Sequence, residues 1–343
     1  MIRKGIILLI GIGSLSLMAC VDKRSYFEDD GMIFHTSYHV KYRADRPMTT
    51  LIDSVLRRFN LSLNPFDPHS TISKVNRNED VEVDEWFATV FNRAEEVSRK
   101  SGGAFDITCA PLVNLWGFGF IRMDGVSPQM VDSIRSFVGY QKVRLEGKKV
   151  VKDDPRILLD CASIAKGYAC DIVAQALEKA GVEDYMVEIG GEVTLKGLNP
   201  AGACWRVGIR KPEEDANDLA DEMEEIIQLC KPGGIATSGD YRNFYIKDGK
   251  KYAHTINPVT GYPAAQDILS ATIVAADCMT ADAYATTFMV LGVEKAKQLA
   301  LTIPEIEYFI VYVNEEGQRK VAYSDGMIPY LPNRQTLAIL ENP

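Results

Sequence analysis

Several patterns that mark common functions are missing from this chain. With 38 Lys and Arg against 47 Asp and Glu, it carries a net charge of −9 and has no basic stripe that could neutralise nucleic-acid phosphates. The glycine patterns G-x-G-x-x-G and G-x-x-x-x-G-K-[ST] are absent, and so is the serine-hydrolase pattern G-x-S-x-G. We therefore exclude nucleic acid as a partner, a Rossmann or P-loop nucleotide site, and a serine hydrolase.

Cysteines with the spacing of metal ligands are also missing. The chain has seven cysteines, but no two form C-x-x-C. Six of them are scattered among apolar or small neighbours, which is typical of small buried hydrophobic residues. In an oxidising compartment one or two disulfides can form, but the spacing does not decide which cysteines pair. These six are Cys109, Cys161, Cys170, Cys204, Cys230 and Cys278.

The N-terminus has the pattern of a lipoprotein. Arg3 and Lys4 precede an apolar run over residues 5–18 that is too short to span a bilayer, and the small Ala19 stands directly before Cys20. This predicts a signal peptide over residues 1–19 that ends in a lipobox, lipidation of Cys20, and a lipid-anchored tether over residues 20–31. We expect a membrane-anchored lipoprotein outside the cytoplasm, on the periplasmic face of the inner membrane. The alternative is a signal peptide cleaved near Ala19, with Cys20 incidental.

Residues 32–343 are expected to form one large α+β domain with mixed or antiparallel sheets and flanking helices. No βαβ regularity, internal repeat or linker rich in Pro, Gly or Ser divides this part of the chain. The acidic stretch 212–229 is interpreted as a solvated surface insertion. Apolar spacing and capping residues predict helices over 48–63, 84–102, 127–139, 163–181, 280–291 and 293–301. Alternation predicts strands over 33–44, 142–145, 156–160, 185–195, 204–210, 241–246, 251–256, 307–314 and 319–322, with a hairpin turn at 248–249.

Residues 101–119 combine glycines, a carboxylate and aromatic side chains without a clean period. Gly102 and Gly103 permit positive φ, Asp106 offers an acceptor, and Phe105 offers a flat apolar face for a heteroaromatic ring. A helix C-cap followed by a loop over the core would use similar residues, so both interpretations stay open.

Asp282 and Thr286 lie four residues apart on a predicted helix. A carboxylate and a hydroxyl then project from one face, and both are hard oxygen ligands suited to Mg²⁺. A capping or surface pair is the alternative explanation.

Residues 159–171 end a predicted strand and open a helix, whose exposed backbone N–H groups favour an anion. Lys166 in the first turn is electrostatically unfavourable unless a bound anion or a fixed carboxylate lies near it. Asp160 and Glu188 are the carboxylates that we expect if the lysine is structural.

Residues 254–263 form a polar turn next to the predicted hairpin. His254 is one of four histidines and the only one in such a turn, which makes it a candidate for proton transfer. A structural histidine is the alternative.

Taken together and in this order, these segments resemble the ApbE family, the FAD:protein FMN transferases, over nearly the whole chain after the signal. The resemblance is carried by residues 103–119, by 160–171 with Ile164-Ala-Lys-Gly-Tyr168, by 237–242 with 254–263, and by Ala281-Asp-Ala-Tyr-Ala-Thr286. Gly190-Gly191-Glu192 is similar to the family's Gly-Gly-Asp.

The resemblance implies a T-fold-like protein that binds Mg²⁺ and takes FAD as its substrate. Such an enzyme transfers the FMN moiety to a Ser or Thr hydroxyl of an acceptor protein, a membrane redox subunit or an extracytoplasmic flavoprotein, and releases AMP. Family metal ligands map onto Asp282, Thr286 and the backbone oxygen of Ser163, and the acceptor's proton goes to His254 or Asp282. Family FAD contacts map onto Phe66, Ala104, Phe105, Asp106, Asp160, Lys166, His254 and Ile256.

Three features depart from the family pattern. Ala162 and Ser163 replace adjacent glycines, Asn257 replaces an Asp, and Phe66 lacks a hydroxyl. Two other functions therefore stay open at this point: a Mg²⁺-dependent FAD pyrophosphatase that releases FMN and AMP, and a tethered FAD-binding lipoprotein without transfer activity. A carrier has no need for a phosphate-directed metal site, so Asp282 and Thr286 disfavour the second.

We predict that Cys20→Ser releases the protein from membranes without unfolding it, because Cys20 precedes every packed element. Membrane fractionation of the two proteins, with thermal melts as a folding control, tests this. Unchanged membrane association of the Ser variant would contradict lipidation at Cys20.

Overall fold

A computed structural model describes residues 24–119, 126–210, 223–239, 244–247, 250–253, 255–264 and 267–332. Its centre is a sheet of eight strands in the order β1-β2-β5-β6-β9-β12-β13-β14, in which every neighbouring pair is antiparallel. Three two-stranded sheets, β3-β4, β7-β8 and β10-β11, lie outside it. The expected α+β class with an antiparallel sheet is confirmed.

The strands of the large sheet are β1 (Ser25–Ile33), β2 (Thr36–Ala44), β5 (Tyr185–Ile189), β6 (Glu192–Lys196), β9 (Gly233–Gly239), β12 (Ile268–Ala275), β13 (Ile306–Val313) and β14 (Arg319–Tyr323). The smaller sheets use β3 (Val143–Glu146), β4 (Lys149–Lys152), β7 (Trp205–Arg210), β8 (Met223–Leu229), β10 (Phe244–Lys247) and β11 (Lys250–Ala253). The helices are α1 (Thr49–Leu63), α2 (Thr71–Asn76), α3 (Glu85–Lys100), α4 (Ala110–Leu115), α5 (Pro128–Arg135), α6 (Ala162–Lys179), α7 (Cys278–Leu291) and α8 (Val293–Ala300), with short 3₁₀ turns η1 (Tyr140–Lys142) and η2 (Asp325–Tyr330).

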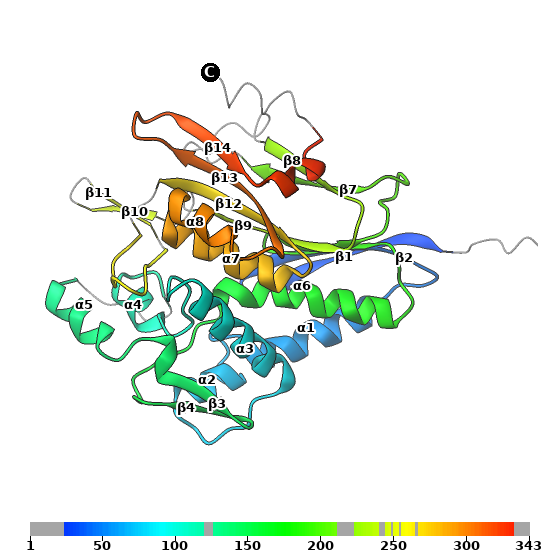
Figure 1. The fold of residues 1–343 in the computed structure, drawn as a ribbon. Helices are drawn as coiled ribbons and strands as arrows, with labels where there is room; N and C mark the ends of the chain where they lie inside the picture. Colours follow the sequence, from blue (N-terminus) through cyan, green and yellow to red (C-terminus); the bar gives the residue numbers. More distant parts are fainter. Residues whose placement is uncertain are drawn as a thin grey trace, which may run out of the picture.

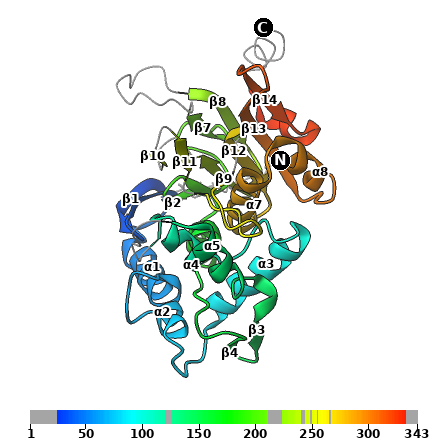
Figure 2. The same ribbon diagram turned by 90° about the vertical axis from the view of Figure 1, so that its left-hand side faces the viewer.

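The sheet is covered on both faces (Figure 1). Helices α6 and α7 pack on one face, and α1 to α5 gather beyond them on the same side (Figures 1 and 2). The β7-β8 ribbon and η2 cover the other face, where Trp205, Ile227 and Met327 belong to a second apolar cluster. Ile310 faces the helical core while its neighbour Phe309 faces the ribbon, as strand alternation requires.

The large helices begin where their sequences predict. Asp84 caps α3 by accepting hydrogen bonds from Trp86 N and Phe87 N, and Ser127 caps α5 at Met130 N. The predicted hairpin forms as β10-β11, and its turn residues 248–249 lie outside the described part of the chain. Within that part, no helix has both the length and the apolarity needed to cross a membrane.

Two predicted boundaries in the large sheet are wrong. Residues 25–33, assigned to the tether and the start of the domain, form β1, which pairs with β2 along its whole length. The fold therefore begins before residue 32. Residues 185–195 form two strands rather than one, because Gly190 (φ 66°) and Gly191 (φ 104°) turn the chain between β5 and β6.

Residues 156–160 do not form a strand. Asn76 takes the hydrogen bonds that a neighbouring strand would make, donating to Leu159 O at 2.9 Å and accepting from Leu159 N at 2.7 Å. The backbone of Asp160 is held by Ile107 O at 2.8 Å. The side chain of Asn76, distant in sequence, thus takes the place of a neighbouring strand at Leu159. A pattern within residues 156–160 cannot reveal such a partner.

The acidic stretch 212–229 is not wholly a surface insertion. Its second half is β8, which pairs with β7 and buries Ile227 and Leu229 against the sheet. Residues 212–222 lie outside the described part of the chain. The many charged residues of this stretch led to the surface interpretation, although Ile227 and Leu229 alternate with polar residues as in a strand.

A disulfide between Cys204 and Cys230 joins the start of β7 to the residue after β8. Cys161, Cys170 and Cys278 are free and buried, in agreement with the prediction of small hydrophobic residues, and Cys109 is free and half-buried. The bridge closes a loop of 26 residues in sequence and thereby limits the freedom of the unfolded chain.

Reduction of this disulfide should lower the free energy of unfolding by about 2–4 kcal/mol, the usual effect of opening a loop of this length. Denaturant unfolding with and without a phosphine reductant measures it. The control is the double variant C204S/C230S, whose stability should not respond to reductant. If reductant lowered the stability of both proteins equally, the effect would not come from the Cys204–Cys230 disulfide.

Candidate functional site

One cavity of about 530 Å³ collects segments from across the chain. It lies where the loop before α4, the first turns of α6, the β5-β6 turn, the end of β9, the turn at 255–258 and α7 converge. Nine of the residues singled out from the sequence line it, namely Ala104, Phe105, Asp106, Asp160, Ser163, Lys166, Ile256, Asp282 and Thr286. Residues separated by as much as 182 positions therefore share one site.

Helices α6 and α7 approach closely beside this cavity. A Cβ on Gly167 would lie 2.3 Å from Cys278 O and 2.8 Å from the Cβ of Asp282, so only glycine permits the contact. Asp282 is 2% exposed, and its Oδ2 accepts a hydrogen bond from Gly167 N at 3.0 Å. Burial raises the pKa of Asp282, although attraction to Lys166 and the Gly167 hydrogen bond oppose it.

Lys166 is held by two carboxylates. Its Nζ lies 2.5 Å from Glu192 Oε1 and 3.9 Å from Asp282 Oδ1. Burial alone would lower the pKa of Lys166, but attraction to Asp282 and Glu192 outweighs burial and raises it. The fixed carboxylate expected near this lysine is present, but it is Glu192.

The partners expected for Lys166 from the sequence are engaged elsewhere. Asp160 accepts a hydrogen bond from Ala162 N at 2.9 Å, and Glu188 accepts one from Gly191 N at 2.6 Å. Asp160 thus caps the first turn of α6, and burial raises its pKa against this hydrogen bond.

Glu192 is a residue of the site to which the sequence reasoning gave no role. It is 5% exposed, and its Oε2 is buried without a hydrogen-bond partner among the described residues. Burial raises the pKa of Glu192 to about 7, attraction to Lys166 opposes this, and repulsion from Asp282 adds to it. The signal in the sequence was the Gly-Gly turn directly before it, which points an acid from β6 into the cavity.

The donors proposed for Mg²⁺ lie along the same wall. Thr286 follows Asp282 by one turn of α7, and its Oγ1 is 3.3 Å from Ser238 Oγ. Across the described residues, no three His, Cys, Asp or Glu side chains cluster as a metal site. Two carboxylates and one ammonium nevertheless leave a negative charge, and the unpartnered Glu192 oxygen adds a further acceptor. Oxygen donors and excess negative charge fit a hard cation.

The glycine-rich segment contributes a wall rather than an open acceptor. Asp106 is 8% exposed, and it accepts hydrogen bonds from Thr108 N and Thr108 Oγ1, both at 2.7 Å, and from Tyr140 N at 2.8 Å. Its carboxylate ties this loop to η1, and burial raises its pKa against these three hydrogen bonds. Phe105 lines the cavity, whereas Trp116 donates from Nε1 to Gly261 O at 2.8 Å and holds the turn at 255–264.

One predicted contact, Phe66, is not part of the cavity wall, and another, His254, cannot be placed. Phe66 is 56% exposed and does not line the cavity; its ring meets that of His35 edge-on, with centroids 5.0 Å apart. His254 lies outside the described residues, as does Cys20. The residues after His254 do reach the site, since Thr255, Ile256 and Pro258 line it.

Asn257, one of the departures from the family pattern, organises this turn. Its Oδ1 accepts hydrogen bonds from Val259 N at 2.9 Å and Thr260 N at 3.1 Å. Either Asn or Asp offers such an oxygen, so the departure does not alter the turn.

Lys166→Met should destabilise the protein more at pH 8 than at pH 5 when metal is chelated. Without the ammonium, Glu192 and Asp282 stay protonated in the folded state at pH values where the unfolded chain has lost those protons, so stability falls as pH rises above about 4.5. We expect a loss of about 1–3 kcal/mol at pH 8, below the full cost of breaking a buried pair because the Lys166 side chain is 28% exposed.

Denaturant unfolding in EDTA at both pH values measures this, and the double variant K166M/E192Q should recover part of the loss. An equal loss at both pH values would mean that the ion pairs of Lys166 with Glu192 and Asp282 are not the cause of the lost stability.

Comparison with known proteins agrees with this geometry. The family model described as "ApbE family" matches residues 34–310. Among curated proteins, an FAD:protein FMN transferase of Vibrio cholerae is 36% identical over 94% of this chain and 98% of its own length. One of Haemophilus influenzae is 36% identical over 84% of this chain and 87% of its own length.

Solved structures show the same fold. The flavin transferase ApbE from Vibrio cholerae aligns with a TM-score of 0.80 at 35% identity, covering 90% of this chain and all of that one. The apo form of the Pseudomonas stutzeri flavinyl transferase ApbE aligns with a TM-score of 0.78 at 28% identity, over 90% of this chain and 97% of that one.

Proposed function

The chain belongs to the ApbE family and is a flavin transferase, and we propose that it moves the FMN moiety of FAD to a Ser or Thr hydroxyl of an acceptor protein in a Mg²⁺-dependent reaction. The acceptor oxygen forms a bond to the phosphorus on the FMN side of the pyrophosphate, the bond to the other phosphate breaks, and AMP leaves. The product is a phosphoester-linked flavoprotein.

The observation that carries the proposal is the composition of the cavity. An apolar wall with Phe105 and Val113, the start of α6 with Ser163, and the oxygen donors Asp282 and Thr286 meet around a single space. A flavin requires an apolar wall, and a pyrophosphate requires cations and backbone N–H groups. A carrier of FAD would also have to accommodate the flavin and the pyrophosphate, but it would gain nothing from cation ligands such as Asp282 and Thr286 directed at the phosphates.

Asp282, Thr286 and the backbone oxygen of Ser163 would hold the Mg²⁺. When bound, this ion neutralises charge on the pyrophosphate oxygens. The orphaned Glu192 oxygen and the net negative charge of the buried groups support the fit, because a cation would compensate both.

The remaining work falls to residues that orient the substrate. In the first turn of α6 the N–H groups of Ala162 and Ile164 donate to Asp160 and Cys161. The N–H of Ser163, a residue of the cavity wall, would face a phosphate there, and Lys166 adds a positive charge one turn further on. Because Asp282 is committed to Gly167 and to the proposed cation, we assign the acceptor proton to His254, which directly precedes the cavity residues Thr255 and Ile256.

We further propose that the enzyme acts from a lipid anchor at Cys20 outside the cytoplasm. Its acceptors would then be membrane redox subunits or extracytoplasmic flavoproteins. The disulfide Cys204–Cys230 is consistent with an oxidising compartment.

We predict that the protein adds FMN to an acceptor domain when it is incubated with FAD and Mg²⁺, and that Asp282→Ala removes this activity. Intact mass spectrometry of an acceptor with a single target Ser or Thr reads the product. The alanine variant loses one of three oxygen ligands but leaves the Phe105 wall in place, so flavin binding should largely persist.

The controls are the acceptor with its target residue changed to Ala, and Asp277→Asn, which alters the same helix outside the cavity. Free FMN and AMP with an unmodified acceptor would instead indicate a pyrophosphatase, and intact FAD would indicate a carrier. Full activity of D282A in Mg²⁺ would remove Asp282 from the cation site.

A further inference from the structure

Asp171 links α6 to the first turn of α7 from behind the cavity. Its Oδ1 accepts a hydrogen bond from Cys278 N and its Oδ2 accepts one from Met279 N, both at 2.9 Å. Oδ1 also accepts one from Thr194 Oγ1 of β6 at 2.7 Å. Asp171 is 7% exposed and does not line the cavity, so none of these contacts belongs to substrate binding.

These contacts complete the start of α7. A helix leaves its first four N–H groups without partners inside the helix. Here Cys278 and Met279 donate to Asp171, and Thr280 donates to Asp277 Oδ1 at 2.8 Å. Ala281 makes the first hydrogen bond within the helix, to Asp277 O at 3.3 Å. Of the three N–H groups in the first turn of α7 that are held by side chains, two are therefore held by a residue of α6.

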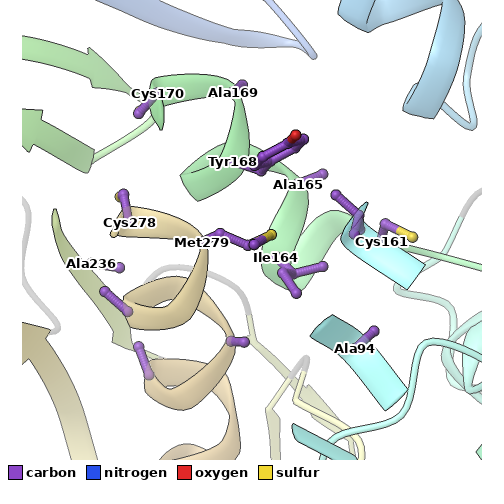
Figure 3. Packing of buried hydrophobic residues seen from close by; sticks show 14 of the residues in the cluster. Ala94, Cys161, Ile164, Ala165, Tyr168, Ala169, Cys170, Ala236, Cys278 and Met279 are labelled. Atoms are coloured by element: carbon purple, nitrogen blue, oxygen red, sulfur yellow. The ribbon is translucent and has the colours of Figure 1, made fainter. Parts of the chain in front are cut away.

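The link from Asp171 is matched by one in the opposite direction. On α6, Gly167 and Asp171 are one turn apart, and on α7, Cys278 and Asp282 are one turn apart. Asp171 holds the N–H of Cys278, while Asp282 holds the N–H of Gly167. Figure 3 shows Met279 of α7 reaching towards α6 at this junction.

Close packing leaves α7 little room to shift. Besides the contact at Gly167, a Cβ on Gly234 of β9 would lie 2.2 Å from Cys278 N. The first turn of α7 is therefore pressed between β9 and α6. Asp282 and Thr286 lie one and two turns further along α7, so the placement of the first turn fixes where their side chains lie.

We propose that Asp171 is a positioning residue for the cation site, which sets the place of Asp282 and Thr286 relative to Ser163 by fixing the start of α7 against α6. The inference rests on the proposed function, because it concerns the residues that we expect to hold Mg²⁺. Outer partners of metal ligands commonly change metal affinity by about 10- to 100-fold when they are removed.

A carboxylate is needed at this place for a geometric reason. Three donors point at its two oxygens, so an amide would direct its own N–H groups at one or more of them. Burial raises the pKa of Asp171 to about 7, against the hydrogen bonds from Cys278, Thr194 and Met279, so an ionised group here costs stability.

Asp171→Asn should raise the Mg²⁺ concentration at the midpoint of Mg²⁺-dependent FAD binding by about tenfold or more. FAD binding is followed by flavin fluorescence while Mg²⁺ is titrated, and again in EDTA. In EDTA the FAD affinity should stay within about twofold of the original protein, because Asp171 does not line the cavity.

Asp277→Ala is the matched control, since it removes the N-cap acceptor of Thr280 N at the same helix start while leaving the hydrogen bonds from Asp171 in place. It should lower the melting temperature, because Ala is a much poorer N-cap than Asp, yet move the Mg²⁺ midpoint by less than about twofold. Equal midpoint shifts in D171N and D277A, or none in D171N, would overturn the positioning role and leave Asp171 as a helix cap.

If D171N does not fold, Thr194→Val takes its place. This variant keeps the carboxylate but removes one of its hydrogen bonds, and it should move the midpoint in the same direction by about threefold. No shift in T194V would then overturn the inference. An original protein whose FAD binding does not respond to Mg²⁺ would overturn the proposed cation site as well, whereas a normal response in both the original protein and D171N would overturn this inference alone.

Discussion

The contact between α6 and α7 at Gly167 is the constraint on which the cavity depends. Each helix supplies half of the proposed phosphate and cation site, Ser163 and Lys166 from one and Asp282 and Thr286 from the other. These halves can meet because Gly167 has no side chain. The backbone N–H of Gly167 donates a hydrogen bond to Asp282 and so links the two helices. The large antiparallel sheet holds both helices on one face and so keeps this contact in place.

The buried charges beside this contact have a second consequence. Glu192, Lys166 and Asp282 come from β6, α6 and α7, and together they carry more negative than positive charge. Such a cluster is costly without a cation, since burial penalises each ionised carboxylate. The same arrangement that lowers the stability of the protein alone is expected to favour the protein bound to Mg²⁺.

Local signals were sufficient for the longer helices and for much of the site, but not for α2 and α4, which have six residues each and were not predicted. Asp84 and Ser127 mark helix starts through capping, and the apolar residues of α1 and α3 recur on one face of each helix. The predictions failed where distant residues decide the backbone. Asn76 replaces a strand partner at Leu159, and β1 forms only because β2 lies alongside it. The strands β9 and β12 were missed, since each is buried on both faces and shows no clear polar alternation.

The sequence by itself determined the family, the α+β class and which oxygen donors and aromatic residues to suspect, because these depend on residue identity and on spacing within one element. Only the tertiary structure decided how those residues are used. In the folded protein Lys166 pairs with Glu192, and Asp106 accepts hydrogen bonds that hold its loop against η1. Phe66 lies on the surface. The reason is physical: the partners of a buried charge come from whichever elements the sheet brings beside it, and no spacing along the chain records that.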